Sequence, residues 1–257
     1  MKDKIIFFDI DGTLLDHDKN IPESTRTAVQ DLKKAGHHVA ISTGRAPFMF
    51  EDLREELGID SFISFNGQFV VFEGDVIYKN PLNTETLQKV LKFSEETDHA
   101  LVFMSDKEMM ATKENHPYIH QSMGSLKFAH PGLNPEFYKQ NEIYQTLLFC
   151  KEGEEEKYAH FEDLNFIRWH EYSTDILPYG GSKAEGIKKL LERLGREKED
   201  IYAFGDGLND LEMIRFAGHG VAMGNAVPAL KEIADFVTKP VDEGGIEYAV
   251  KELGLLP

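Results

Sequence analysis

The sequence predicts an α/β fold in which a parallel β-sheet is covered by helices and interrupted by an α+β insert. Three observations support this prediction. The run Ile5-Ile6-Phe7-Phe8 is apolar throughout, as in a strand that is buried on both faces. Strand-like and helix-like segments alternate up to about residue 80, and they alternate again from Lys183 to the C-terminus. Residues 81–182 do not continue this alternation.

The first half of the core reads as a βαβαβ unit with a hairpin added at its end. Pro22 is suited to the start of a helix and Gly36 to its end, because proline fixes the backbone of a first turn and glycine tolerates a left-handed cap. The expected elements are a helix between Pro22 and Gly36 with Thr25, Ala28, Val29, Leu32 and Ala35 on its apolar side, a strand at 38–42, a helix at 47–57, a strand at 62–65, the turn Asn66-Gly67, and a hairpin of 68–72 and 76–78 with its turn at Gly74-Asp75.

The second half of the core resumes the alternation after the insert. Gly195 ends the first of its expected helices. The expected elements are a helix through Ile187, Leu190, Leu191 and Leu194, a strand at 201–204, a helix at 210–217, a short strand at 220–223, and helices around Ala229 and Tyr248.

The insert carries strand-like segments without the glycine-rich strand ends of the core. These segments are 101–104, 109–112, 144–149 and the long run 166–177. The acidic run from Glu152 to Glu156 suggests a solvated helix start. We therefore predict a core formed by residues 1–80 and 183–257, and an α+β domain formed by residues 81–182.

The composition is that of a globular protein with an excess of acidic residues. The chain has 257 residues, of which 45 are acidic and 28 basic, so its formal net charge is −17. This charge disfavours nucleic-acid and anionic-membrane partners. Cys150 is the only cysteine and is expected as a small buried residue of an apolar interior. No apolar run approaches membrane-spanning length. With no signal peptide recognised at the N-terminus, we expect a cytoplasmic protein. The oligomeric state is left open.

Two carboxylates follow the first strand directly, in Asp9-Ile10-Asp11-Gly12. Ligands of open α/β sheets bind where such strands end. Two acidic side chains this close repel each other unless a cation lies between them or one of them holds a proton. An acidic turn without a chemical role is the alternative for this stretch taken alone.

Three further clusters stand at expected strand ends. Thr43-Gly44-Arg45 offers a hydroxyl and backbone N–H groups of the kind that bind phosphate, although a capping turn uses the same residues. Lys183 follows Gly180-Gly181-Ser182 where the chain returns to the core. The segment from Gly205 to Asp210 contains two carboxylates and an amide, which suit a hard cation.

In order and spacing these four clusters resemble the motifs of the haloacid dehalogenase superfamily of phosphohydrolases. The resemblance extends over essentially the whole chain. The position of the insert, together with Val221-Ala-Met-Gly-Asn225-Ala near the end, is similar to the Cof-type branch with a large α+β cap. The resemblance implies a Rossmann-like, doubly wound parallel sheet, and a cap that selects the substrate. Asp175 stands where this branch tends to have a glutamate, so a substrate contact of that longer side chain is not carried over.

The resemblance also implies a role for each motif residue. Asp9 would be the nucleophile, Asp11 the general acid and base, and Lys183 would hold the phosphoryl group. Further expected phosphate or substrate contacts come from Thr43, Gly44 and Asn209, with Asn209 orienting either phosphate or Lys183. The expected Mg²⁺ ligands are Asp9, the backbone carbonyl of Asp11, Asp206 and, close by, Asp210. Arg45 is expected to pair with a core carboxylate or a helix end.

The expected function is therefore the Mg²⁺-dependent hydrolysis of a small phosphorylated metabolite, such as a sugar phosphate, through an aspartyl phosphate. A phosphomutase of the same superfamily is an alternative, which an assay for isomer formation would distinguish. A phospho-aspartate signalling module is a second alternative. Such modules carry neither an insert of this size nor a second carboxylate two residues after the first.

Overall fold

The computed structural model describes residues 3–256 and divides into two compact units. The first unit, called the core below, contains the chain up to Arg45, Phe50–Tyr78 and the chain from Ser182 onward. The second unit, called the insert domain, contains Ala46–Met49 and Lys79–Gly181. The predicted α/β fold class with a parallel sheet is confirmed.

The core is built on an eight-stranded sheet with the order β14-β13-β12-β1-β2-β3-β4-β5. Neighbouring strands from β14 to β3 are parallel, and β4 is antiparallel to β3. The strands are β1 (Ile5–Phe8), β2 (His38–Ser42), β3 (Ser61–Ser64), β4 (Phe69–Phe72), β5 (Asp75–Lys79), β12 (Ile201–Gly205), β13 (His219–Ala222) and β14 (Phe236–Val237).

The position of β1 explains its apolar sequence. Its two edges pair with β2 and β12, and every residue from Ile5 to Phe8 is fully buried. The chain proceeds from β1 to β2 on one side, while the strands of the second half extend from β12 on the other side. The strand order therefore reverses at β1, and the carboxyl ends of β1 and β12 frame the place where open α/β sheets bind ligands.

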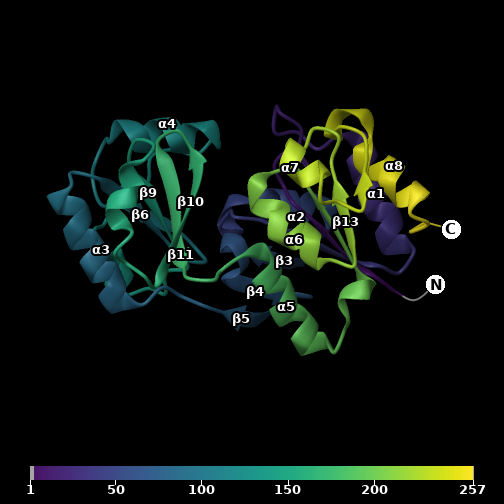
Figure 1. Cartoon of the computed structure of the whole chain (residues 1–257), viewed down its shortest axis with the longest axis horizontal. Helices are drawn as coiled ribbons and strands as arrows, with labels where there is room; N and C mark the ends of the chain where they lie inside the picture. Colours follow the sequence, from purple (N-terminus) through teal and green to yellow (C-terminus); the bar gives the residue numbers. More distant parts are fainter. Residues whose placement is uncertain (1–2, 257) are drawn as a thin grey trace. The chain divides into compact units, whose positions relative to one another are not determined.

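Helices pack in two groups around this sheet (Figure 1). In one group α1 contacts both α2 and α8, and in the other α6 contacts both α5 and α7. The α-helices are α1 (Glu23–Lys34), α2 (Glu51–Leu57), α5 (Lys183–Leu194), α6 (Leu211–Phe216), α7 (Pro228–Lys231) and α8 (Gly245–Glu252). The 3₁₀ turns of the core are η2 (Phe65–Gly67), η5 (Lys198–Asp200), η6 (Leu208–Asp210) and η7 (Val241–Glu243), and η1 (Pro47–Met49) belongs to the insert domain.

Several element boundaries in the core differ from the prediction. The expected helix 47–57 is a 3₁₀ turn followed by α2, and Phe50 between them has non-helical backbone angles. The hairpin turn is Glu73-Gly74, with φ of 49° and 84°, because a two-residue turn that follows the strand twist needs positive φ at both positions. Ala35 is exposed, since α1 ends at Lys34.

The insert domain is an α+β unit with a six-stranded sheet of order β10-β11-β9-β6-β7-β8. The expected long strand 166–177 is instead an antiparallel hairpin, with its turn at Glu171-Tyr172. The elements are α3 (Thr84–Glu96), β6 (Ala100–Met104), β7 (Met109–Ala111), α4 (Pro117–Ser125), β8 (Gly132–Leu133), η3 (Phe137–Lys139), β9 (Gln145–Phe149), η4 (Glu154–Tyr158), β10 (Leu164–His170) and β11 (Ser173–Pro178).

The insert domain has an apolar core of its own. Leu87 and Val90 of α3 pack in one cluster with Leu101 and Phe103 of β6. Cys150 is fully buried in the same cluster, which confirms its expected place, and burial raises the pKa of its thiol. A buried cluster of this kind is the mark of a domain rather than of a loop.

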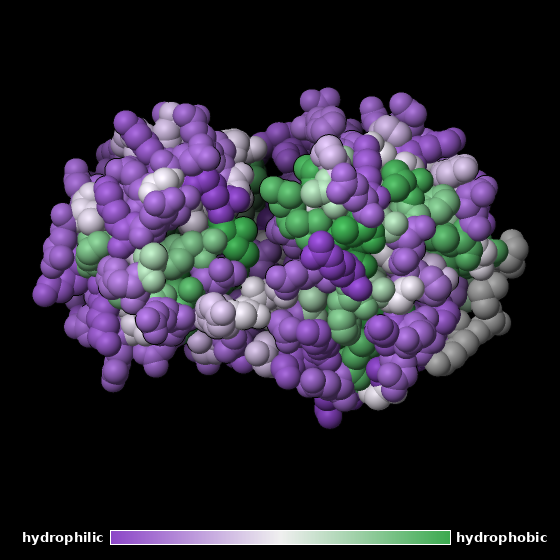
Figure 2. Space-filling model, in the orientation of Figure 1, coloured by the Kyte–Doolittle hydropathy of each residue, from purple (hydrophilic) through white to green (hydrophobic). Residues whose placement is uncertain are grey.

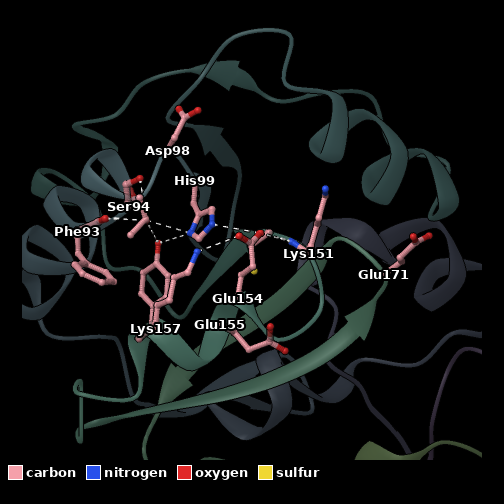
Figure 3. A network of polar contacts seen from close by, with 12 residues as sticks. Phe93, Ser94, Asp98, His99, Lys151, Glu154, Glu155, Lys157 and Glu171 are labelled. Atoms are coloured by element: carbon pink, nitrogen blue, oxygen red, sulfur yellow. Dashed lines mark hydrogen bonds and ion pairs between the residues drawn. The ribbon is translucent and has the colours of Figure 1, made fainter.

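The acidic run of the insert domain is more ordered than a solvated helix start. Figure 3 shows His99 beside Glu154, whose carboxylate lies 3.6 Å from the His99 Nε2 atom. The Tyr158 hydroxyl lies 3.0 Å from the His99 Nδ1 atom. Glu155 pairs with Arg168 of β10. These contacts hold η4 against His99, which directly precedes β6, and against β10, so two acids of the run are structural.

The surface drawn in Figure 2 is mostly hydrophilic on both units, as the high charged fraction predicts. Apolar side chains gather in that view over α6 and α7 of the core. Within residues 3–256, every helix is too short or too polar to cross a membrane.

Candidate active site

Asp9 and Lys183 form the centre of the site in the core. Asp9 follows β1 directly and is only 7% exposed. Lys183 is the first residue of α5 and is 1% exposed. The Lys183 Nζ atom donates to Asp9 Oδ1 at 2.5 Å and to Asp210 Oδ1 at 2.6 Å. A buried ammonium is stable only with such partners, so the lysine and both carboxylates form one charged cluster.

The position of Lys183 results from local structure at the start of α5. Ser182 is the N-cap of this helix, and its hydroxyl accepts from the Glu185 N–H at 3.3 Å. Gly67 of η2 approaches so closely that a Cβ on it would lie 2.0 Å from the Ser182 carbonyl oxygen. The conformation of η2 therefore determines where α5 begins.

Asp210 has hydrogen-bond partners on both of its oxygens. While Oδ1 accepts from Lys183, Oδ2 accepts from the backbone N–H groups of Asp206 and Gly207, each at 3.0 Å. A Cβ on Gly205 would lie 2.6 Å from the Asp210 carboxyl carbon. Asp210 therefore closes the loop after β12 and also contributes charge to the cluster.

Asp206 is the third carboxylate of the cluster. Asp9, Asp206 and Asp210 each offer an oxygen atom, and these atoms lie within 4.8 Å of one another. Gly12, with φ of 81°, lies against Asp206, and a Cβ there would be 2.2 Å from Asp206 Oδ2. Glycine is required at this position both for its backbone conformation and for this close approach.

The charges of this cluster suit a divalent cation. When all three carboxylates are ionised, they and the single ammonium leave two negative charges in a largely buried place. Burial raises the pKa of Asp9 to about 8, since the neighbouring carboxylates add to desolvation and together they outweigh Lys183. Burial and Asp210 likewise raise the pKa of Asp206 to about 7. An all-oxygen donor set with this charge fits Mg²⁺.

Asp11 points to a different set of partners. Arg45 forms a bidentate pair with its carboxylate, with Nε 2.9 Å from Oδ2 and Nη2 2.6 Å from Oδ1. Lys19 donates to Asp11 Oδ1 at 2.6 Å. Burial acts to raise the pKa of Asp11, but Arg45 and Lys19 outweigh it and the pKa is lowered. Arg45 thus pairs with a core carboxylate, as expected, and the expected metal contact of the Asp11 backbone carbonyl stays a prediction.

Thr43 and Gly44 lie at the end of β2. The Thr43 hydroxyl accepts from the Arg45 N–H at 3.1 Å, which leaves its own O–H free to donate to a ligand. The Asn66 N–H donates to the Thr43 carbonyl at 3.1 Å. The Asn66 amide packs on Gly44, because a Cβ on Gly44 would lie 3.0 Å from Asn66 Nδ2. Phosphate binding by Thr43 and Gly44 stays a prediction.

Asn209 lies on η6 and is exposed. Lys183 donates to Asp9 and Asp210, and the expectation that Asn209 orients either phosphate or Lys183 stays a prediction. Its exposed amide remains placed for a ligand. Lys19, Asn66 and Asn225 all contact site residues, but the sequence pattern predicted no role for them. The turn pair Asn66-Gly67 and the segment around Asn225 were the sequence features that could have indicated two of these residues.

Comparisons with known proteins agree with this geometry. The family model of haloacid dehalogenase-like hydrolases matches residues 6–250. The chain is 61% identical over 256 residues to the putative phosphatase YkrA of Bacillus subtilis, with 100% of both chains covered. It is 31% identical to 5-amino-6-(5-phospho-D-ribitylamino)uracil phosphatase YitU of the same species, with 98% of this chain and 97% of that protein covered. The solved structure of the subclass IIB sugar phosphatase BT4131 matches with a TM-score of 0.86 and 31% identity, covering 98% of this chain and 100% of that one.

Proposed function

This chain belongs to the haloacid dehalogenase-like hydrolases, in the Cof-type phosphatase branch, and from that premise we propose that it hydrolyses phosphate monoesters of small metabolites with Mg²⁺ through an aspartyl phosphate. The observation that carries the proposal is the buried cluster of Asp9, Asp206 and Asp210 around Lys183. Its net negative charge calls for a cation, and its place at the end of β1 is the ligand-binding edge of the sheet.

Asp9 is the proposed nucleophile. One of its carboxylate oxygens forms a bond to phosphorus while the bond from phosphorus to the ester oxygen breaks, and the leaving oxygen takes a proton from Asp11. Lys183 engages Asp9 Oδ1 at 2.5 Å, which fixes the direction of the carboxylate. Bound Mg²⁺ would supply positive charge that offsets the repulsion between a carboxylate and a phosphate dianion.

Asp11 is the proposed general base of the second step. It removes a proton from water, the water oxygen bonds to phosphorus, and the acyl phosphate bond to Asp9 breaks. Phosphate leaves, Asp9 is again a carboxylate, and Asp11 holds a proton for the next cycle. The ordinary ionised state of Asp11 beside Arg45 and Lys19 suits this proton acceptance.

The phosphoryl oxygens are expected to bind to Lys183, which contacts Asp9, and to groups at other strand ends of the core. Thr43 offers its O–H, Gly44 its backbone N–H, Lys183 its ammonium and Asn209 its exposed amide. These groups recognise a phosphoryl group and nothing beyond it. Substrate choice therefore has to come from elsewhere.

We expect the insert domain, which contains the predicted insert of residues 81–182 up to Gly181, to act as a cap that selects the leaving group. YitU and BT4131 are named for a phosphoribitylamino compound and for sugars, respectively. Both of these substrate classes carry phosphate on a polyhydroxylated carbon chain. Sugar and sugar-alcohol phosphates are accordingly the first substrates to test.

The proposal is tested with the purified full-length chain and a panel of sugar, nucleotide and vitamin-precursor phosphates. Inorganic phosphate is measured, and chromatography of the products distinguishes hydrolysis from isomer formation by a mutase. We expect Mg²⁺-dependent phosphate release that a chelator stops and Mg²⁺ restores.

The Asp9→Asn variant is expected to lose turnover while it keeps its fold, because the amide preserves the shape and loses the nucleophile. Asp31→Asn is the matched control, since Asp31 pairs with Lys34 on the surface of α1. Appreciable phosphate release by pure, folded Asp9→Asn protein would remove Asp9 from the nucleophile role.

A further inference from the structure

Asn225 connects three segments of the core that are far apart in the sequence. It lies in the turn between β13 and α7. Its Nδ2 atom donates to the Gly12 carbonyl at 2.8 Å and lies 3.4 Å from Asp206 Oδ2. Its Oδ1 atom accepts from the Val241 N–H at 2.9 Å. The amide thus uses its donor side on the acidic cluster and its acceptor side on the chain after β14.

The turn that carries Asn225 is held in place from both sides. The Gly224 N–H donates to the Lys239 carbonyl at 2.9 Å, and a Cβ on Gly224 would lie 2.3 Å from the Pro240 nitrogen. Lys231 donates to the Gly224 carbonyl at 2.6 Å. The Asn225 amide is therefore fixed by its backbone before any ligand binds.

Asp206 needs this support because its surroundings otherwise repel its charge. It lies near Asp9 and Asp210, and its other side-chain donor is the Thr13 hydroxyl at 3.5 Å. Gly12 packs directly against Asp206 Oδ2, so a shift of the Gly12 backbone would change the space available to the Asp206 carboxylate. Because the Asn225 amide contacts both the Gly12 carbonyl and the Asp206 carboxylate, it fixes the positions of both groups.

We propose that Asn225 is a positioning residue for the cation site, which holds the Asp206 carboxylate and the Gly12 turn in the geometry that binds Mg²⁺. This inference rests on the proposed function, because it takes Asp9, Asp206 and Asp210 as the place of the cation. Residues that hydrogen-bond to metal ligands orient those ligands, and their loss typically weakens metal affinity ~10–100-fold.

The test measures Mg²⁺ binding to the metal-free, full-length protein by isothermal titration calorimetry, so its readout is independent of turnover. Asn225→Ala is expected to raise the Kd for Mg²⁺ by ~10–100-fold. Lys231→Met is the matched control, because it removes a hydrogen bond from the same turn and none from Gly12 or Asp206. Its Kd is expected to stay that of the wild type, and circular dichroism confirms that both variants are folded.

Asn225→Asp provides a second and stricter measurement. It keeps an acceptor for the Val241 N–H, removes the donor, and adds a negative charge near the site. A purely electrostatic effect would strengthen Mg²⁺ binding, whereas loss of the positioning contact weakens it. We expect weaker binding, and in turnover assays of both Asn225 variants we expect a higher Mg²⁺ concentration at half saturation with kcat largely recovered at saturating Mg²⁺.

The outcomes separate this inference from the proposed function. If the wild type itself fails to bind Mg²⁺, the proposed cofactor is wrong and the inference fails with it. If the wild type binds and Asn225→Ala binds equally well, or Asn225→Asp binds more tightly, only the role of Asn225 is overturned. An equal weakening by Lys231→Met would assign the effect to the stability of the turn and would also overturn it.

Discussion

Asp11 lies between two cations, and this environment bears on both steps in which we propose it acts. Arg45 and Lys19 keep its pKa low against the effect of burial. An ionised carboxylate is ready to take a proton from water. To give a proton to the leaving oxygen it must first be protonated, so we infer that Asp11 exchanges its contact with Arg45 for the leaving group when substrate arrives.

The Asp11→Asn variant checks this assignment at the scale of the single residue. The amide can neither donate the acidic proton nor accept one from water, so turnover is expected to fall ~10²–10⁴-fold. Mg²⁺ affinity is expected to change little, because the proposed metal contact of Asp11 is its backbone carbonyl. Steady-state rates at saturating Mg²⁺ and calorimetric Mg²⁺ titration give the two values. A variant that lost metal affinity and kept its rate would contradict the acid and base role.

At the scale of elements, the contact between η2 and α5 positions the catalytic lysine. Phe65, Asn66 and Gly67 all have positive φ, of 51°, 50° and 101°. Such a run is costly for residues other than glycine, and here it brings the Gly67 backbone against Ser182. Gly186 of α5 also approaches this backbone, since a Cβ on it would lie 2.9 Å from the Gly67 Cα.

We expect Gly67→Ala to lower turnover as well as stability. A Cβ at this position would lie 2.0 Å from the Ser182 carbonyl oxygen, so α5 has to shift and carry Lys183 with it. Gly74→Ala is the matched control, because Gly74 also has positive φ, of 84°, and a Cβ there meets nothing within 4 Å.

The left-handed backbone alone costs alanine roughly 1–2 kcal/mol. Both variants are therefore expected to lose unfolding free energy in urea titrations, and only Gly67→Ala is expected to lose kcat. Equal kcat values for the two variants would mean that η2 does not position Lys183.

Elements with strong local signals could be predicted from the sequence, and those set by distant contacts could not. The strand His38–Ser42 agrees with its predicted bounds because an apolar run stands between clear breakers. The break at Phe50 and the turn at Glu171-Tyr172 carry no glycine, proline or asparagine. Burial of Phe50 and pairing between β10 and β11 determine these two features, and neither is visible in a local pattern.

The same distinction holds for the site. The proximity of Asp9, Asp206 and Asp210 could be predicted because the carboxyl ends of parallel strands share one edge of a sheet. Lys19 and Asn225 contact the site from turns whose backbone course depends on hydrogen bonds within and around each turn, which a local sequence pattern does not reveal. Lys19 has φ of 64° in a turn in which the Asp16 carboxylate accepts from the Asp18 and Asn20 N–H groups.

At the scale of the whole molecule, the raised pKa values of Asp9 and Asp206 link stability to pH. In the metal-free protein the folded state holds protons on these groups up to pH values of about 8 and about 7. The unfolded chain releases the same protons near pH ~4. Their contribution to the free energy of unfolding therefore falls as the pH rises between these limits.

Mg²⁺ is expected to reverse this loss, because a bound cation favours the ionised carboxylates. The stabilisation by Mg²⁺, measured as the difference in unfolding free energy between Mg²⁺ and chelator, should grow from about pH 5 to about pH 8. Urea titrations at both pH values measure it, and the difference cancels the other titrating groups. A stabilisation that is equal at both pH values, or larger at the lower one, would contradict the proposed coupling.

The interrupted core also sets an order of events during synthesis. The ribosome delivers Asp9 before the insert domain, and Lys183, Asp206 and Asp210 emerge only after it. That domain is nearly continuous in sequence and has its own apolar cluster, so it can fold before β12, the pairing partner of β1, has been synthesised. A nascent chain therefore cannot assemble the cluster of Asp9, Asp206, Asp210 and Lys183 until the segments after the insert domain have been made.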